Sequence, residues 1–207
     1  MTKLLKHGIT SATPQNLMLG AGTIYKNLQY KTESKTWDGV ILGATSGGNK
    51  FTITPTINDI EMDGAFVKVK GLRVKQGEEA TMEVNAAETS PGIFKMALIG
   101  EDIKSSDADY VEGFNAIRTK SAIADEDYID NIAFVGFRSD NKPVIIIMDN
   151  ALCTSGLDGQ GTSGENTVYT LTFECHADIS AGGDGEKNLD TLPVRVYYPS
   201  TTAVAAG

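Results

Sequence analysis

An alternation of apolar and polar residues with a period of two constrains the fold of this chain more than any other feature. The clearest case is the segment 167–176, where the apolar positions are Tyr169, Leu171, Phe173 and Cys175. Residues 80–87 repeat the pattern, with apolar positions at Ala80, Met82, Val84 and Ala86. Successive side chains of a β-strand point to opposite faces, so both segments predict strands with one buried and one wetted face.

Two other segments, 129–137 and 144–148, are apolar at nearly every position. This pattern indicates strands in the middle of a sheet, covered on both sides. The segment 51–57 instead alternates apolar residues with threonines and contains Pro55. Because proline has no backbone N–H to donate, Pro55 predicts an edge strand or a bulge.

One segment, 89–100, has the signals of an α-helix. Its start, Thr89-Ser90, offers a capping hydroxyl, Pro91 suits the first turn, and Gly100 is a terminating glycine. The apolar residues of this segment are Ile93, Phe94, Ala97 and Leu98. We expect a short helix that lies across a sheet.

Neither a linker nor an internal repeat divides the 207 residues, a length that suits one domain. We predict a mainly β chain: a β-sandwich or β-barrel-like domain over 37–198 with one short packed helix. An N-terminal arm and first strand over 1–36 precede it, and a flexible C-terminal tail over 199–207 follows. Extended loops are expected at 37–50, 153–166 and 181–189, which are rich in glycine and small polar residues.

The net charge of −9 is distributed unevenly. Residues 1–50 carry +4, whereas residues 101–150 carry −6 and residues 151–207 carry −5. Affinity for nucleic acid comes chiefly from Lys and Arg contacts with phosphates, so this acidic body excludes tight nucleic-acid binding. It does not exclude a surface past which nucleic acid slides. A solubilising surface charge is the simpler explanation.

Residues suited to catalysis are scarce. His176 follows Cys175, but adjacent strand residues point to opposite faces and cannot form a dyad. Cys153 and Cys175 are expected to be core or surface residues. The acidic run 125–130 lacks the spacing of a calcium loop, and the glycine-rich run 156–164 lacks the lysine and helix of a phosphate loop. We therefore predict no catalytic residue, no metal site, no cofactor and no enzyme.

No stretch approaches the roughly 18 apolar residues of a membrane span, and the N-terminus lacks the apolar core of a signal peptide. We expect a protein made in the cytoplasm, with no membrane among its partners.

Four segments carry a resemblance to a known family: 41–52, 60–65, 81–100, and 127–136 leading into 144–148. In order and spacing they resemble the major tail tube proteins of long-tailed (siphovirus-type) bacteriophages, particularly those of Gram-positive hosts. The resemblance covers roughly residues 37–176. It implies a β-sandwich-like fold with one helix, shared with the tubes of contractile tails and secretion needles.

The resemblance also implies partners and a location. Six copies would form a ring, and stacked rings would form a hollow tube through which phage DNA leaves the capsid without specific binding. Tail tip and tail terminator proteins would close the tube, which is assembled in the host cytoplasm and ends in the virion. Strand edges of the subunit would pair with neighbouring copies.

Two sets of residues are candidates for the channel wall. One is Glu79, Thr81, Glu83 and Asn85; the alternative is Thr170, Thr172 and Glu174. An acidic wall would repel the phosphate backbone of DNA. For either set, the other interpretation is an outer face that meets solvent.

A third candidate site is the predicted loop 37–49, with Trp37, Ile41, Leu42 and Asn49. Large apolar groups in a glycine-rich loop need a place to be buried, so we expect this loop to contact another ring or subunit. The lysines of the N-terminal region are expected to meet the acidic body of a neighbour: Lys3, Lys6, Lys26, Lys31 and Lys35.

Other functions fit the same patterns. The inner-tube subunit of a contractile tail or of a phage-derived bacteriocin differs by the sheath around its tube. A monomeric carbohydrate-binding β-sandwich module would also account for the strands, the loops and the acidic residues. A hydrolase that uses surface carboxylates is the least supported, because the chain has few acid–base groups.

Overall fold

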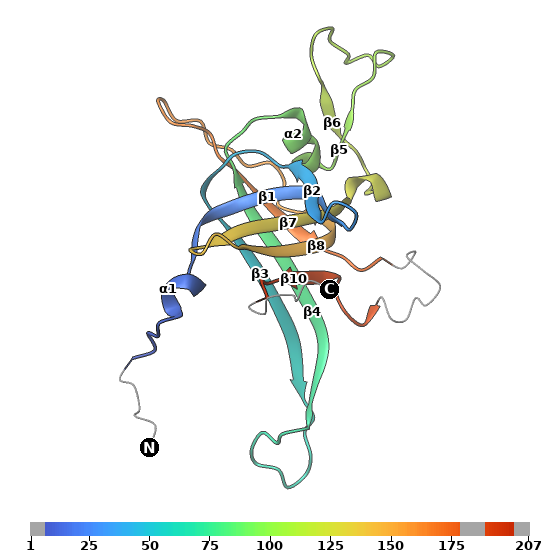
Figure 1. Ribbon diagram of the computed structural model, residues 1–207. Coiled ribbons are helices and arrows are strands. Elements are labelled where there is room, and N and C mark those ends of the chain that lie inside the picture. Colours follow the sequence, from blue (N-terminus) through green and yellow to red (C-terminus); the bar gives the residue numbers. More distant parts are fainter. Residues whose placement is uncertain (1–6, 179–188, 201–207) are drawn as a thin grey trace.

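The computed structural model describes residues 7–178 and 189–200, which are organised around one large antiparallel sheet (Figure 1). In chain order its strands are β1 (Met18–Lys31), β2 (Thr36–Ile41), β3 (Thr45–Asp59), β4 (Arg73–Ala86), β7 (Ile129–Arg138), β8 (Pro143–Cys153), β9 (Tyr169–Cys175) and β10 (Val194–Tyr197). Neighbouring strands follow the order β2-β1-β7-β8-β9-β4-β3, and β10 also pairs with β8. The expected mainly β, sandwich-like fold is confirmed.

The sheet curls so that β3 and β4 cover β7 and β8. Phe51 of β3 and Phe134 of β7 meet across the two layers, with ring centroids 5.3 Å apart. β3 also reaches β1, because the Asn49 side-chain nitrogen donates to the backbone oxygen of Ala21 at 3.1 Å. The space between the layers is filled by fully buried side chains, including Ile24, Met82, Val84, Ile93, Ile132, Met148, Leu171 and Phe173.

The period-two segments lie in strands as predicted. The apolar faces of β4 and β9 are buried in this core, and β7 and β8 lie in the middle of the sheet. Pro55 is in β3, at the end of the strand order, next to a register shift between Thr56 and Ile57. The predictions of two central strands and of an edge position for Pro55 are confirmed.

The second face of β7 and β8 has a core of its own, which explains why these strands are apolar on both sides. Its members are Leu28, Ala133, Val135, Ile145 and Ile147. Trp37 of β2 packs against this second core, and its ring lies 5.0 Å from that of Tyr197 in β10. Side chains of β1 and β2, Tyr25 and Trp37, therefore cover the second core.

A buried asparagine supports an irregularity in β1. Asn27 has a left-handed backbone (φ 54°), and the β1–β2 register shifts between Lys26 and Gln29. Asn131 Oδ1 accepts a hydrogen bond from Leu28 N (2.8 Å), and Asn131 Nδ2 donates to Leu28 O (3.3 Å). Buried backbone groups need hydrogen-bond partners. At the bulge, the Asn131 side chain therefore makes the two hydrogen bonds to Leu28 that a neighbouring strand would otherwise make.

One edge of β8 has two partners. Its residues 145–148 pair with β10, whereas its residues 151–153 pair with β9. Between these pairings Asn150 has a left-handed backbone (φ 48°), a conformation that asparagine tolerates better than most residues. Its side chain donates to His176 O at 3.1 Å, so the change of partner is fixed by a hydrogen bond.

The predicted helix is present as α2 (Pro91–Leu98), and the side chain of Ser90 caps its first turn. Its end differs from the prediction, because Ile99 rather than Gly100 takes the left-handed conformation (φ 47°). Gly100 is needed for close packing: a Cβ there would lie 2.8 Å from Ile117 Cγ2. No helix within residues 7–178 and 189–200 has the length and apolar character to cross a membrane.

Besides β2 and β10, four small elements were not predicted. They are α1 (Thr13–Asn16), the 3₁₀ turn η1 (Asp125–Asp127), and a two-stranded sheet of β5 (Gly100–Asp102) and β6 (Ile117–Thr119). The strands β1 and β2 belong to the main sheet, so the sheet extends N-terminally of residue 37.

The loop predicted over 37–50 is wrong, because β2 extends to Ile41 and β3 begins at Thr45. Gly39, Gly47 and Gly48 of this segment lie in strands. Gly47 and Gly48 (φ 84° and 88°) form a bulge in β3, and a Cβ at Gly39 would lie 3.0 Å from Leu28 Cα in the neighbouring strand. The loop predicted at 153–166 is confirmed between β8 and β9. Most of 181–189, and the tail from 201 on, lie outside the described residues.

Candidate assembly surfaces

The two alternative sets of channel residues lie on one face of two neighbouring strands. β4 and β9 pair so that Thr81 is opposite Glu174, Glu83 opposite Thr172, and Asn85 opposite Thr170. We call this surface the polar face; it consists of Glu79, Thr81, Glu83 and Asn85 of β4 and Thr170, Thr172 and Glu174 of β9. Lys50, Thr52 and Thr54 of β3, opposite Glu83, Thr81 and Glu79, continue it.

Hydrogen bonds connect the strands of the polar face. Thr170 Oγ1 donates to Asn85 Oδ1 (2.8 Å), and Asn85 Nδ2 donates to Gly48 O (2.8 Å). Within the described part of the chain, Glu79 and Glu83 make no hydrogen bond or ion pair through their side chains. The polar face therefore presents free carboxylates between hydroxyl and amide groups.

The hairpin of β3 and β4 projects from one end of the sandwich (Figure 1). Its loop, residues 60–72, is folded into two turns, 62–65 and 69–72, each closed by a backbone hydrogen bond. Gly64 and Gly71 occupy the third positions of these turns with φ values of 88° and 95°. Such positions favour glycine, because other side chains are strained there.

The hairpin loop carries large apolar side chains that face solvent. Phe66 is 98% exposed and Val67 is 78% exposed. Further exposed apolar residues of the loop and the adjoining strand ends are Ile57, Ile60, Met62, Val69 and Val74. Clusters of this kind mark interaction surfaces.

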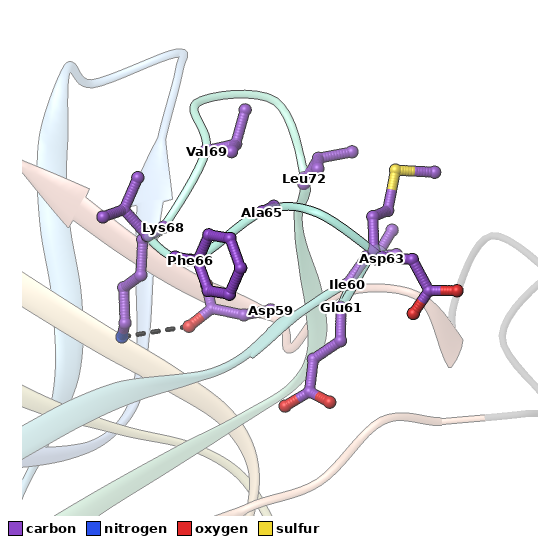
Figure 2. A pocket seen from close by; sticks show the side chains of 11 residues that line it. Asp59, Ile60, Glu61, Asp63, Ala65, Phe66, Lys68, Val69 and Leu72 are labelled. Carbon is purple, nitrogen blue, oxygen red and sulfur yellow. Dashed lines mark ion pairs between the residues drawn. The ribbon is translucent and has the colours of Figure 1, made fainter.

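The loop surrounds a hollow of about 430 Å³, with the Phe66 ring on one side (Figure 2). We call it the tip hollow; its apolar lining includes Ile60, Phe66, Val69 and Leu72. Lys68 Nζ and Arg73 Nε reach the Asp59 carboxylate at 2.9 and 2.6 Å. The hydrogen bond from Lys68, and then that from Arg73, lowers the pKa of Asp59 below its usual value.

A second projection, residues 100–119, lies at the opposite end of the sandwich (Figure 1). We call it the arm; it contains β5, β6 and the loop between them. Arg118 holds its base by ion pairs with Glu101 (2.8 Å) and Asp107 (3.6 Å). At its loop, Phe114 is 72% exposed. Like the tip, the arm presents an aromatic ring that the described residues leave largely exposed.

The residues predicted to form an apolar contact loop do not lie together on the surface. Trp37 is in β2, where its ring contacts Tyr30 and Tyr197. Leu42 is buried in the main core, and Asn49 links β3 to β1. Ile41 is exposed, at 55%. Trp37, Leu42 and Asn49 thus have roles in holding the fold together.

The cysteines and the acidic run have ordinary structural environments. Both cysteines are buried, and burial raises the pKa of Cys175 to about 12 and also raises that of Cys153. Asp127 of the acidic run pairs with Lys120 at 2.7 Å. In the chain as described here, no group of three or more His, Cys, Asp or Glu side chains could hold a metal ion.

Comparison with protein-family models gives no match for this chain, and comparison with curated proteins gives none either. Its function must therefore be argued from its own residues and geometry.

The hairpin tip was missed as a site by sequence reasoning. A signal was present, because Asp63-Gly64 and Lys70-Gly71 are turn sequences that flank a short apolar run, 65–67. Their spacing predicts two turns in one loop. It does not predict that the apolar run faces solvent, since apolar residues are normally assigned to a core.

Proposed function

We propose that this chain is a structural subunit that assembles with copies of itself into stacked rings, and that the stack is the tail tube of a long-tailed bacteriophage. The observation that carries the proposal is the projecting β3–β4 hairpin with its exposed Phe66 and Val67. Burying one such side chain contributes about 1.5–3 kcal/mol. A neighbouring copy is a partner that is always available to a self-assembling subunit.

In the proposed tube, the polar face lines the channel. Its carboxylates repel phosphates of passing DNA, and this repulsion acts over about 8 Å at physiological salt. The effect is therefore confined to DNA that approaches the wall. Its threonines add polarity without positive charge, so nothing on this face offers the Lys and Arg contacts on which DNA affinity depends, apart from Lys50 at its margin.

Other parts of the proposal follow from the resemblance of the sequence to tail tube proteins. They are the hexameric symmetry of the rings, the tail tip and terminator proteins as partners, assembly in the bacterial cytoplasm and a final place in the virion. A sheath around the tube would instead identify a contractile tail or a phage-derived bacteriocin.

The proposal is tested by sedimentation velocity over a concentration series, with negative-stain electron microscopy of the same samples. We expect rings or hollow tubes that increase with concentration. Phe66→Asp should reduce assembly strongly, whereas Ile123→Asp, at an exposed apolar residue outside the hairpin, should not. A chain that stays monomeric at every concentration, and binds glycans in direct titration, would overturn the proposal in favour of a carbohydrate-binding module.

A further inference from the structure

The two ends of the sandwich differ in shape. The β3–β4 hairpin ends in the tip hollow, which is lined by apolar side chains and by the charged side chains of Asp59, Glu61, Asp63 and Lys68 (Figure 2). The arm lies at the opposite end (Figure 1), and it carries Phe114, whose side chain is 72% exposed. A hollow at one end and an exposed side chain at the other can meet only between different copies.

Local backbone structure holds Phe114 in its exposed position. Phe114 N donates to Val111 O at 3.2 Å, which closes a turn over 111–114. Gly113 occupies the third position of this turn with φ 87°. Tyr110 and Val111 flank the ring and are also exposed. The arm therefore presents a small apolar knob whose backbone is fixed before any partner arrives.

The two ends also differ in charge. The tip loop, residues 60–72, has two Lys and two Asp or Glu, whereas residues 100–119 of the arm have two Lys or Arg and five Asp or Glu. Lys70 lies on the tip loop and Glu112 on the arm, two residues from Phe114. In the described part of the chain neither has an ion-pair partner. Both are free to meet an opposite charge on another molecule.

We propose that Phe114 of one copy occupies the tip hollow of a second copy, and that Glu112 of the first meets Lys70 of the second. The inference rests on the proposed function, and it names the partner surface of the hairpin. The contact joins two different patches, so each copy keeps one free tip and one free arm. Such a heterologous contact propagates in one direction and gives an open stack of defined polarity.

Two variants that each disable one end test this contact. Phe114→Ala removes the knob, and Phe66→Asp places a charge beside the hollow. Neither variant should elongate alone. An equimolar mixture should form species of twice the mass of those that either variant forms alone, since one intact arm and one intact tip remain. Ile123→Ala, at an exposed residue outside the arm, is the matched control and should elongate like the unmodified chain.

The outcomes separate this inference from the proposed function. If the unmodified chain never assembles, the proposed function fails. If it assembles and Phe114→Ala elongates equally well, the proposed function stands and the knob-and-hollow contact is wrong. If neither variant elongates and their mixture gives no doubled species, the heterologous contact is wrong.

A charge exchange tests the second part of the contact. Lys70→Glu and Glu112→Lys should each raise the concentration needed for assembly by about 2- to 10-fold, as expected for an exposed ion pair turned into a repulsion. The double variant should return to within about 2-fold of the unmodified chain. Glu33→Lys, which changes charge away from both ends, should have no such effect. A double variant as weak as the two single changes combined would overturn the Lys70–Glu112 pairing.

Discussion

Replacing Asn131 by alanine should destabilise the fold strongly, although asparagine is a polar residue in an apolar strand. Asn131 is 5% exposed, and its side chain satisfies both backbone groups of Leu28 at the β1 bulge. A buried polar group left without a partner costs about 1–3 kcal/mol. Two such groups, with some relief from water entering the gap, give an expected loss of about 2–4 kcal/mol.

The loss is measured as the free energy of unfolding in urea, with Asn58→Ala as the control. Asn58 is an exposed asparagine of β3, and its replacement should change the free energy of unfolding by less than about 0.5 kcal/mol. An Asn131→Ala variant that loses no more than this control would refute the reasoning. It would mean that Leu28 finds other partners without the side chain.

Three further predictions concern a close approach, a buried thiol and the polar face. Gly22→Ala should cost about 2–4 kcal/mol in urea unfolding, because φ is 71° and the added Cβ would collide with a core phenylalanine ring. Cys175 should resist a thiol reagent at pH 8 until the protein is unfolded. Because burial raises its folded pKa to about 12, its contribution to stability is present below the unfolded pKa of about 8.5 and declines as pH rises above it. Rapid labelling of folded protein would contradict this. Glu83→Lys should slow DNA release from assembled particles without preventing tube assembly, whereas Glu33→Lys should leave the release rate unchanged; equal rates would remove the polar face from the channel.

The strands of the core could be predicted because the apolar positions of their sequences are the positions that the structure buries. The segment 80–87 forms one half-buried strand with its alternation unbroken, and 129–137 is buried on both faces. β1 was harder to predict, since glycines and the bulge at Asn27 interrupt its alternation. The glycines at 47 and 48 led to a predicted loop where the chain forms a bulged strand.

The candidate site shows a different limit. The residues of the polar face were named from the outward positions of two strands, but their union into one surface depends on the pairing of β4 with β9. That pairing joins residues about ninety positions apart, and local patterns carry no information about register over such a separation. The hairpin tip was missed because its apolar residues face solvent, against the rule by which a core is recognised.

The shared edge of β8 has a consequence for synthesis on the ribosome. Residues 145–148 remain without their β10 partner until residues 194–197 have been translated, a delay of several seconds at about 5–20 residues per second. During that time the nascent chain exposes an apolar strand edge, which can pair with the same edge of a chain emerging from the next ribosome on the message. A slower rate of translation over residues 154–193 would lengthen this window and should increase co-translational aggregation.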